Sequence, residues 1–102
     1  MTNVTKNNIN TIINNPKLIV LFFNNPTCGP CEGVKISLSV AQKAYPNVLY
    51  CSVNTHADEE IPKRYGIRTT PALIFIKKNK EVGRLTGSIT PAMIVSIIKS
   101  NS

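Results

Sequence analysis

The hydrophobic pattern of the chain alternates between strand-like runs and helix-like stripes. Three nearly continuous apolar runs, residues 17–23, 48–53 and 72–77, are rich in β-branched and aromatic residues. Such runs are typical of strands that are buried on both faces. A weaker run, 81–85, follows a turn at 78–80 that is short enough for a β-hairpin. The pattern therefore predicts four strands, the last two paired as a hairpin.

Helical spacing fills the intervals between these runs. Apolar residues three and four positions apart predict a short helix around residues 9–13. A longer helix is predicted by one apolar stripe, which consists of Val34, Leu38, Ala41 and Tyr45. Residues 58–65 predict a short third helix, and Gly66 is suited to end it.

The last helix has the clearest start signal. Thr90 can cap it and Pro91 suits its first position, while Ile89 and Ile94 occupy the positions of a hydrophobic staple. The resulting order, α-β-α-β-α-β-β-α, predicts an α/β fold with a mixed central sheet of about four strands and helices on both faces. The first two strands are joined by a helical crossover and are expected to be parallel.

The length of 102 residues matches a single domain, so we expect residues 1–102 to form one domain and to act as a monomer. The longest unbroken apolar run, 18–23, is far shorter than the roughly 20 residues of a membrane-spanning helix. The N-terminal segment also lacks the pattern of a secretory signal. We therefore expect a cytoplasmic protein without membrane association.

The formal net charge is +7, from 12 basic and 5 acidic residues. Such a charge attracts anionic partners at long range. The basic residues are nevertheless spread along the chain, with no basic run and no interleaved aromatic residues. A solvated surface explains them better than nucleic-acid binding, which is not expected.

The candidate chemistry lies at Cys28 and Cys31, which flank Gly29-Pro30 between the first strand and the second helix. A thiolate near a helix start is stabilised by free backbone N–H groups and by the helix dipole. We therefore expect Cys28, the more exposed of the two, to attack a substrate disulfide, and Cys31, one turn on, to resolve the mixed disulfide. Gly29 allows close approach of a substrate, and Pro30 stiffens the start of the helix.

Two alternatives compete with this redox interpretation. The first is a zinc site with three cysteines and one histidine, nominally Cys28, Cys31, Cys51 and His56. Cys51 lies within a strand pattern, however, and is expected to fill the core, and His56 is expected to be an ordinary loop residue. The second is a cysteine pair without function, which the position at a helix start disfavours. No metal and no bound cofactor are therefore expected, and the dithiol itself is the redox group.

In this context the Cys-Gly-Pro-Cys quartet resembles the thioredoxin family, and the resemblance covers nearly the whole chain. Residues 18–35, "LIVLFFNNPTCGPCEGVK", are similar to the family's strand, active site and helix. Residues 64–87, "RYGIRTTPALIFIKKNKEVGRLTG", are similar to its Tyr-Gly-Ile-Arg segment, cis-proline loop and final hairpin. The resemblance implies the thioredoxin fold and a thiol–disulfide oxidoreductase that reduces disulfide-containing proteins. It also implies electron transport from NADPH through a thioredoxin reductase, in cell redox homeostasis.

The resemblance further implies a substrate groove. Pro71 would be cis and pack opposite the cysteines, and the Thr70 backbone would hydrogen-bond an incoming substrate strand. Gly87 matches a family glycine that lines the same groove. The substrate-binding residues expected on this basis are Thr27, Gly29, Pro30, Thr70, Pro71 and Gly87.

Three positions depart from the family pattern. Thr27 replaces the usual Trp, so a flat apolar contact surface is missing. Phe22 replaces a buried Asp thought to assist proton transfer at the second cysteine, and Tyr50 aligns with the Lys that pairs with it. We predict that aromatic packing replaces the charge pair and that Cys31 resolves slowly, especially below neutral pH. Glu32 either substitutes for the missing base or only favours the helix N-terminus.

These departures leave other functions open. One is a glutaredoxin-like or specialised redox protein with a different reductant. The other is a binding subunit that uses the thioredoxin scaffold. The basic surface is suitable for such a role, but the intact Cys28 and Cys31 argue against it.

Overall fold

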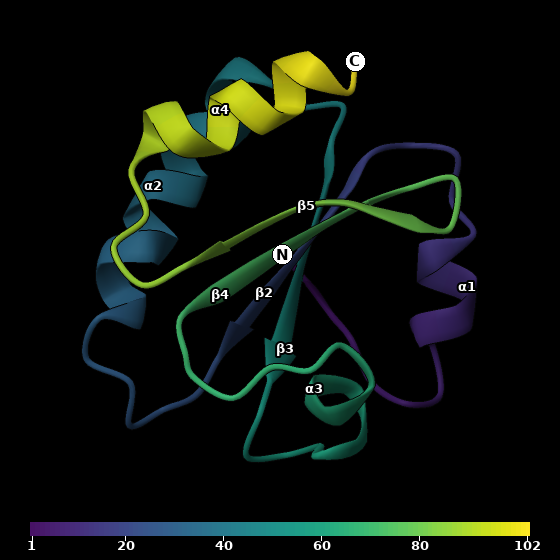
Figure 1. The fold of residues 1–102 in the computed structure, drawn as a ribbon, viewed down its shortest axis with the longest axis vertical. Coiled ribbons are helices and arrows are strands. Elements are labelled where there is room, and N and C mark those ends of the chain that lie inside the picture. The colour runs from purple at the N-terminus through teal and green to yellow at the C-terminus, as the bar shows by residue number, and fades with distance from the viewer.

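The structure is a computed structural model that describes residues 1–102. Its central sheet has five strands in the order β1-β3-β2-β4-β5, with helices packed against it (Figure 1). In chain order the elements are β1 (Thr2–Asn3), α1 (Ile9–Ile13), β2 (Ile19–Asn24), α2 (Cys31–Ala44), β3 (Leu49–Asn54), α3 (Glu60–Arg64), β4 (Ala72–Lys77), β5 (Lys80–Thr86) and α4 (Pro91–Ser100). None of the helices is both long and apolar enough to cross a membrane.

The strand pairing confirms the predicted mixed sheet. β2 and β3 are parallel, with α2 as the crossover between them, whereas β4 runs antiparallel to both β2 and β5. The additional strand, β1, consists of two residues that pair with Cys51 and Ser52 along the outer edge of β3. Two residues are too few to show a periodicity, so the sequence pattern did not predict this strand.

The central strands of the sheet are buried on both faces because their side chains alternate between two apolar layers, whereas the edge strands β1 and β5 are largely exposed. In β2, Ile19, Leu21 and Phe23 point to the layer that contains the apolar side chains of α1 and α3. Val20 and Phe22 point the other way, to the layer shared with α2 and α4. All five of these side chains are at most 2% exposed. The continuous apolar runs therefore indicate two-sided burial, as predicted.

The predicted boundaries shift by one or two residues at several elements. The first long strand begins at Ile19 and continues to Asn24, and α2 ends at Ala44, one residue before Tyr45. The hairpin turn consists of Lys78 and Asn79 alone, whose φ values are 51° and 65°. Positive φ at both central residues is what a two-residue hairpin turn of type I′ requires.

The start of α4 confirms its predicted signal. The Thr90 hydroxyl accepts a hydrogen bond from the Met93 backbone N–H at 3.2 Å, and Pro91 is the first helical residue. Helix α4 lies beside α2 on one face of the sheet (Figure 1). The Ser37 hydroxyl on α2 donates to the Ile89 carbonyl at 3.0 Å, which fixes the loop before α4 against α2.

Gly83 on β5 is a point where the sheet and α4 approach closely. A Cβ at Gly83 would lie 2.9 Å from Ile97 Cγ2. We therefore expect Gly83→Ala to lower the free energy of unfolding by about 1–3 kcal/mol through overpacking. Urea denaturation of the purified variant measures this difference.

The matched control is Gly33→Ala on α2, where an added Cβ meets no atom within 4 Å. There, alanine is expected to raise the free energy of unfolding by up to about 1 kcal/mol because of its higher helix propensity. If the two variants had the same stability, the close approach of Ile97 would have no energetic consequence.

Candidate active site

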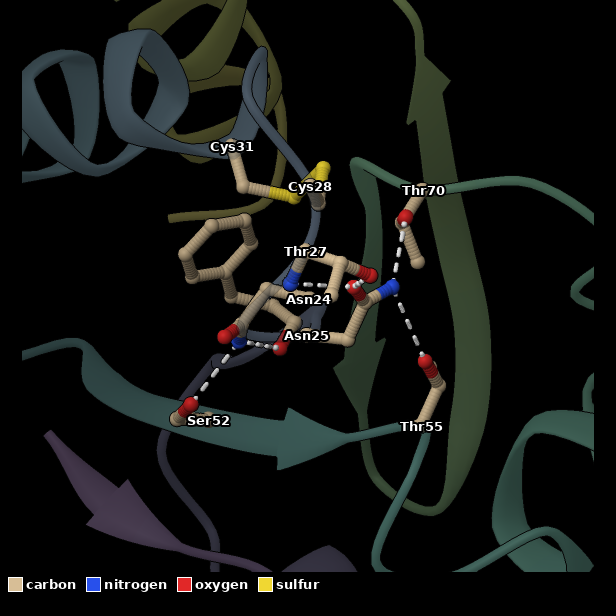
Figure 2. The surroundings of a disulfide bond; sticks show 9 residues. Asn24, Asn25, Thr27, Cys28, Cys31, Ser52, Thr55 and Thr70 are labelled. Carbon is tan, nitrogen blue, oxygen red and sulfur yellow. Dashed lines mark hydrogen bonds between the residues drawn. A yellow bond between two sulfur atoms is a disulfide. The ribbon is translucent and has the colours of Figure 1, made fainter.

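Cys28 and Cys31 lie where the chain leaves β2 and enters α2. Their sulfur atoms form a disulfide of 2.08 Å, with the two Cα atoms 5.4 Å apart (Figure 2). The helix begins at Cys31, with Pro30 at its N-cap, so Cys28 stands two residues before the cap. Cys31 is buried at 6% exposure, whereas Cys28 is half-buried. The predicted difference in exposure between the two cysteines is confirmed.

The turn between the cysteines is held by backbone hydrogen bonds. The Cys31 N–H donates to the Cys28 carbonyl and the Glu32 N–H to the Gly29 carbonyl, both at 3.3 Å. Gly29 and Pro30 are exposed at the tip of this turn. The turn thus presents the outer cysteine at the surface while the helix retains the inner one.

The Thr70–Pro71 peptide is cis, as the resemblance implied. Pro71 is buried at the start of β4, and its carbonyl accepts a hydrogen bond from the Gly87 N–H at 3.3 Å. Gly87 has a φ of 74°, a conformation in which glycine avoids the strain that a side chain would introduce. The cis-proline loop at Thr70–Pro71 and the loop at Gly87 therefore run side by side.

The six expected substrate-binding residues are divided between two hollows on either side of the cysteine turn. One hollow, of about 520 Å³, is lined by Pro30, Thr70, Pro71 and Gly87, together with Gly33, Val34, Ser88 and Ile89. Thr27 and Gly29 line the other hollow, of about 450 Å³, together with both cysteines. We call the first the proline groove and the second the cysteine hollow.

The cysteine hollow is lined by further polar residues, of which only Glu32 was considered from the sequence. Asn24, at the end of β2, donates from Nδ2 to Ser52 Oγ at 2.9 Å and to the Phe22 carbonyl at 3.0 Å (Figure 2). Glu32 and Lys35, from the first turns of α2, line the same hollow. The polar Asn24-Asn25 pair directly after an apolar strand was the available sequence signal.

The apolar layer that contains Cys31 also contains the buried aromatic side chains of Phe22 and Tyr50. Phe22 is 2% exposed and Tyr50 is 5% exposed, and both belong to the apolar layer that contains Cys31. The Tyr50 hydroxyl donates to the Tyr45 carbonyl at 3.0 Å, and burial raises the pKa of Tyr50 to about 12. Tyr50 therefore stays neutral over the physiological range. Both positions hold buried aromatic side chains, as predicted, but the residue opposite Phe22 on β3 is Ser52, and Tyr50 lies opposite Val20. Tyr50 is therefore not the partner of Phe22.

The structure does not assemble the four residues of the alternative zinc site. Cys51 is fully buried in the layer with α1 and α3, on the opposite face of the sheet from Cys31. His56 is exposed in the loop after β3. No three His, Cys, Asp or Glu side chains are grouped so that they could hold a metal ion. The prediction that Cys51 fills the core is confirmed.

Burial of Cys51 has a consequence for alkaline stability. Burial raises the pKa of its thiol from 9.0 to about 11. Because the folded state holds this proton more tightly than the unfolded state, the stability that Cys51 contributes falls as pH rises from about 9 to 11. The loss approaches about 3 kcal/mol, since each pKa unit corresponds to about 1.4 kcal/mol.

This loss is measured as the difference in free energy of unfolding between wild type and Cys51→Ala, both with the Cys28–Cys31 disulfide intact. Titration of Tyr50 is common to both proteins and cancels in the difference. A difference that stays constant from about pH 8 to 11.5 would contradict the assigned thiol titration.

Comparison with known proteins gives a consistent result. A sequence profile for the family described as Thioredoxin matches residues 1–100. Thioredoxin H5 of Oryza sativa subsp. japonica is 30% identical over 81 residues, which are 79% of this chain and 60% of that protein. Thioredoxin-1 of Drosophila melanogaster is 30% identical over 73 residues, or 71% of this chain and 68% of that protein. The matches to the rice proteins Thioredoxin H5 and Thioredoxin H4-2 span only 60% and 58% of their lengths.

Solved structures extend the likeness to the whole chain. A thioredoxin of Fasciola hepatica has a TM-score of 0.90 at 28% identity, covering 100% of both chains. A thioredoxin of Trypanosoma brucei brucei has a TM-score of 0.91 at 20% identity, covering 99% of this chain and 89% of the other, and supports the fold alone. The predicted thioredoxin fold is confirmed. Since the family profile spans nearly every residue and the Cys28–Cys31 disulfide occupies the predicted active-site position, the chain belongs to the thioredoxin family.

Proposed function

We propose that this protein is a thiol–disulfide oxidoreductase that reduces disulfide bonds in proteins. The observation that carries the proposal is the Cys28–Cys31 disulfide at the start of α2, with the outer cysteine accessible and the inner one buried. A thiolate is favoured at this position because the N-terminus of a helix is the positive end of its dipole. The attacking group in thiol–disulfide exchange is a thiolate.

The reaction proceeds in two exchanges. In the reduced protein, the Cys28 thiolate attacks one sulfur of the substrate disulfide, and the other substrate sulfur leaves as a thiolate and takes up a proton. Cys31 then loses its proton and attacks Cys28 Sγ, which releases the second substrate thiolate. The substrate gains two electrons and the protein is left with the Cys28–Cys31 disulfide, the state seen in the structure.

The proline groove supplies a place for the substrate chain. Thr70 and Pro71 lie immediately before β4, and the groove they line is also lined by Pro30 at the tip of the cysteine turn. An extended substrate segment that bonds to the Thr70 backbone would present its disulfide to Cys28 by strand addition. Gly87 widens this groove because it has no side chain.

The protein needs an external reductant to begin another cycle. We propose an NADPH-dependent thioredoxin reductase as the donor, disulfide-containing proteins as substrates, and no bound cofactor besides the cysteine pair. We further propose that residues 1–102 act as one monomeric domain in the cytoplasm.

A second candidate is a redox protein that uses a small thiol such as glutathione as its donor. The polar cysteine hollow favours it, because Thr27 and Asn24 leave both cysteines beside a space of about 450 Å³. A space of this size is within the range that small ligands occupy.

The test is reduction of insulin disulfides with three donors: dithiothreitol, NADPH with thioredoxin reductase, and glutathione with glutathione reductase and NADPH. We expect acceleration over dithiothreitol alone and turnover with thioredoxin reductase. Turnover with glutathione only would support the second candidate. The reduction potential of the Cys28–Cys31 pair is a second measurement. A value of about −270 mV supports the reductase role, whereas a value of about −120 mV indicates an oxidant. Absence of any acceleration would overturn both candidates.

A further inference from the structure

The Asn25 side chain connects three loops around the active site. Its carbonyl oxygen accepts hydrogen bonds from the Thr27 N–H at 3.0 Å and from the Thr27 hydroxyl at 2.8 Å. Its amide group donates to Thr70 Oγ1 at 3.1 Å and to Thr55 Oγ1 at 3.4 Å. Figure 2 shows Asn25 between these three threonines, which come from separate segments of the chain.

The backbone of Asn25 also supports the cysteine turn. Its carbonyl accepts a hydrogen bond from the Cys28 N–H at 3.2 Å. Through one residue, the position of Cys28 is therefore tied to Thr70, which precedes the cis-proline. No other hydrogen bond joins these two loops directly.

The two loops must keep a fixed separation for the exchange to work. A substrate strand bound along the Thr70 backbone can deliver its sulfur to Cys28 only if the distance between the loops is defined. Catalytic efficiency is sensitive to such placement, because displacements near 1 Å reduce rates by about 10²-fold. The Asn25 amide is half-buried and bonds to both loops, at 2.8 Å to the Thr27 hydroxyl and at 3.1 Å to the Thr70 hydroxyl, so it is suited to define this separation.

We propose that Asn25 is a positioning residue that holds the cis-proline loop at Thr70 in register with the cysteine turn, and thereby determines the efficiency toward protein disulfides. This inference rests on the proposed function. It concerns substrates that bind along the proline groove, and not small disulfides that need only reach Cys28.

The test compares two substrates in one set of variants. Insulin is the protein disulfide, and 5,5′-dithiobis(2-nitrobenzoate) is a small disulfide that does not require the groove. The variants are Asn25→Ala, Thr70→Val, which removes the hydroxyl but keeps the shape, and Thr70→Ser, which restores the hydroxyl. Thr55→Val is the matched control, since it removes the longer of the two bonds donated by Asn25 without touching the cis-proline loop.

We expect Thr70→Val to lower kcat/KM for insulin by about tenfold, the effect of one hydrogen bond. Asn25→Ala is expected to lower it at least as much, because it also removes the bonds to Thr27 and Thr55. Thr70→Ser is expected to retain wild-type efficiency, and Thr55→Val to change it less than twofold. The double variant is expected to be no worse than Asn25→Ala alone, since Asn25→Ala already removes the bond to Thr70. The rate with the small disulfide is expected to stay within about twofold in all variants.

Equal losses for insulin and the small disulfide would overturn the proposal, because they would indicate a general defect in fold or thiol reactivity. Full activity of Asn25→Ala on insulin, or additive losses in the double variant, would overturn it as well. Urea denaturation of each variant shows whether it is folded under assay conditions. If wild type itself reduced neither disulfide, the proposed function would fail instead, so the two failures are distinguishable.

Discussion

Replacing Cys28 with serine is expected to abolish catalysed disulfide reduction, so that the rate falls to that of the reductant alone. A hydroxyl at this position cannot form the mixed disulfide, so the loss is at least about 10³-fold, as for removal of other catalytic nucleophiles. Replacing Cys31 with serine is also expected to abolish turnover, but by a different route. Cys28 can still attack, and the mixed disulfide persists because no second thiol displaces the substrate.

The two variants are distinguished by mass spectrometry under non-reducing conditions after mixing with insulin. Cys31→Ser is expected to give a covalent adduct in near-stoichiometric amount, and Cys28→Ser none. Both are made in a Cys51→Ala background, which removes the buried third thiol as a source of adducts. An adduct on Cys28→Ser instead of Cys31→Ser would reverse the assigned roles, even though Cys31 is buried at 6% exposure.

Phe22→Asp is expected to have the largest effect on stability. Phe22 is 2% exposed in the layer that contains Cys31, and loss of a buried phenylalanine alone costs about 3–5 kcal/mol. A carboxylate at this site is poorly solvated, so its pKa is raised above that of the unfolded chain. The free energy of unfolding is therefore expected to fall further as pH rises from about 4 to 7.

The same variant tests whether Cys31 lacks a proton acceptor. Reaction of the reduced protein with 5,5′-dithiobis(2-nitrobenzoate) releases a first chromophore when Cys28 attacks and a second when Cys31 resolves. Stopped-flow absorbance separates these two phases. We expect the second phase to be slow in wild type, most of all below neutral pH, and faster in Phe22→Asp.

Phe22→Asn is the matched control for Phe22→Asp, because asparagine has the size of aspartate and leaves the same cavity but has no titrating group. It is expected to show a slow second phase and no change of stability between about pH 4 and 7 beyond that of wild type. Equal second-phase rates in the aspartate and asparagine variants across about pH 6 to 8 would remove the idea that a base is missing. Both variants are assayed under conditions in which denaturation curves show them folded.

Several features could be predicted from the sequence because each has a local physical signature. The three central strands were evident because they are apolar on both faces, which leaves no polar alternation in β2 or β4. The start of α4 was evident because Thr90 and Pro91 have properties that are useful only at a helix N-terminus. Cys51 was assigned to the core from its place in an apolar run, and it is fully buried.

Other features had no such signature. β1 has two residues and exists only because the edge of β3 offers free backbone groups to Thr2 and Asn3. The six expected substrate-binding residues were treated as one surface, but the cysteine turn divides them between the proline groove and the cysteine hollow. Asn25 was not singled out, because its partners Thr55 and Thr70 lie 30 and 45 residues away along the chain.

The sequence by itself determined the alternation of helices and strands, the two-sided burial of the central strands and the pair of cysteines at the start of a helix. These follow from the periodicity of apolar residues and from the preferences of a few capping and turn residues, which act over one or two turns. The tertiary structure alone decided which side of the cysteine turn each polar residue lines, and that one amide bridges the cysteine turn and the cis-proline loop. Such contacts depend on the relative position of loops at the ends of different strands, and only the pairing of the whole sheet sets that position.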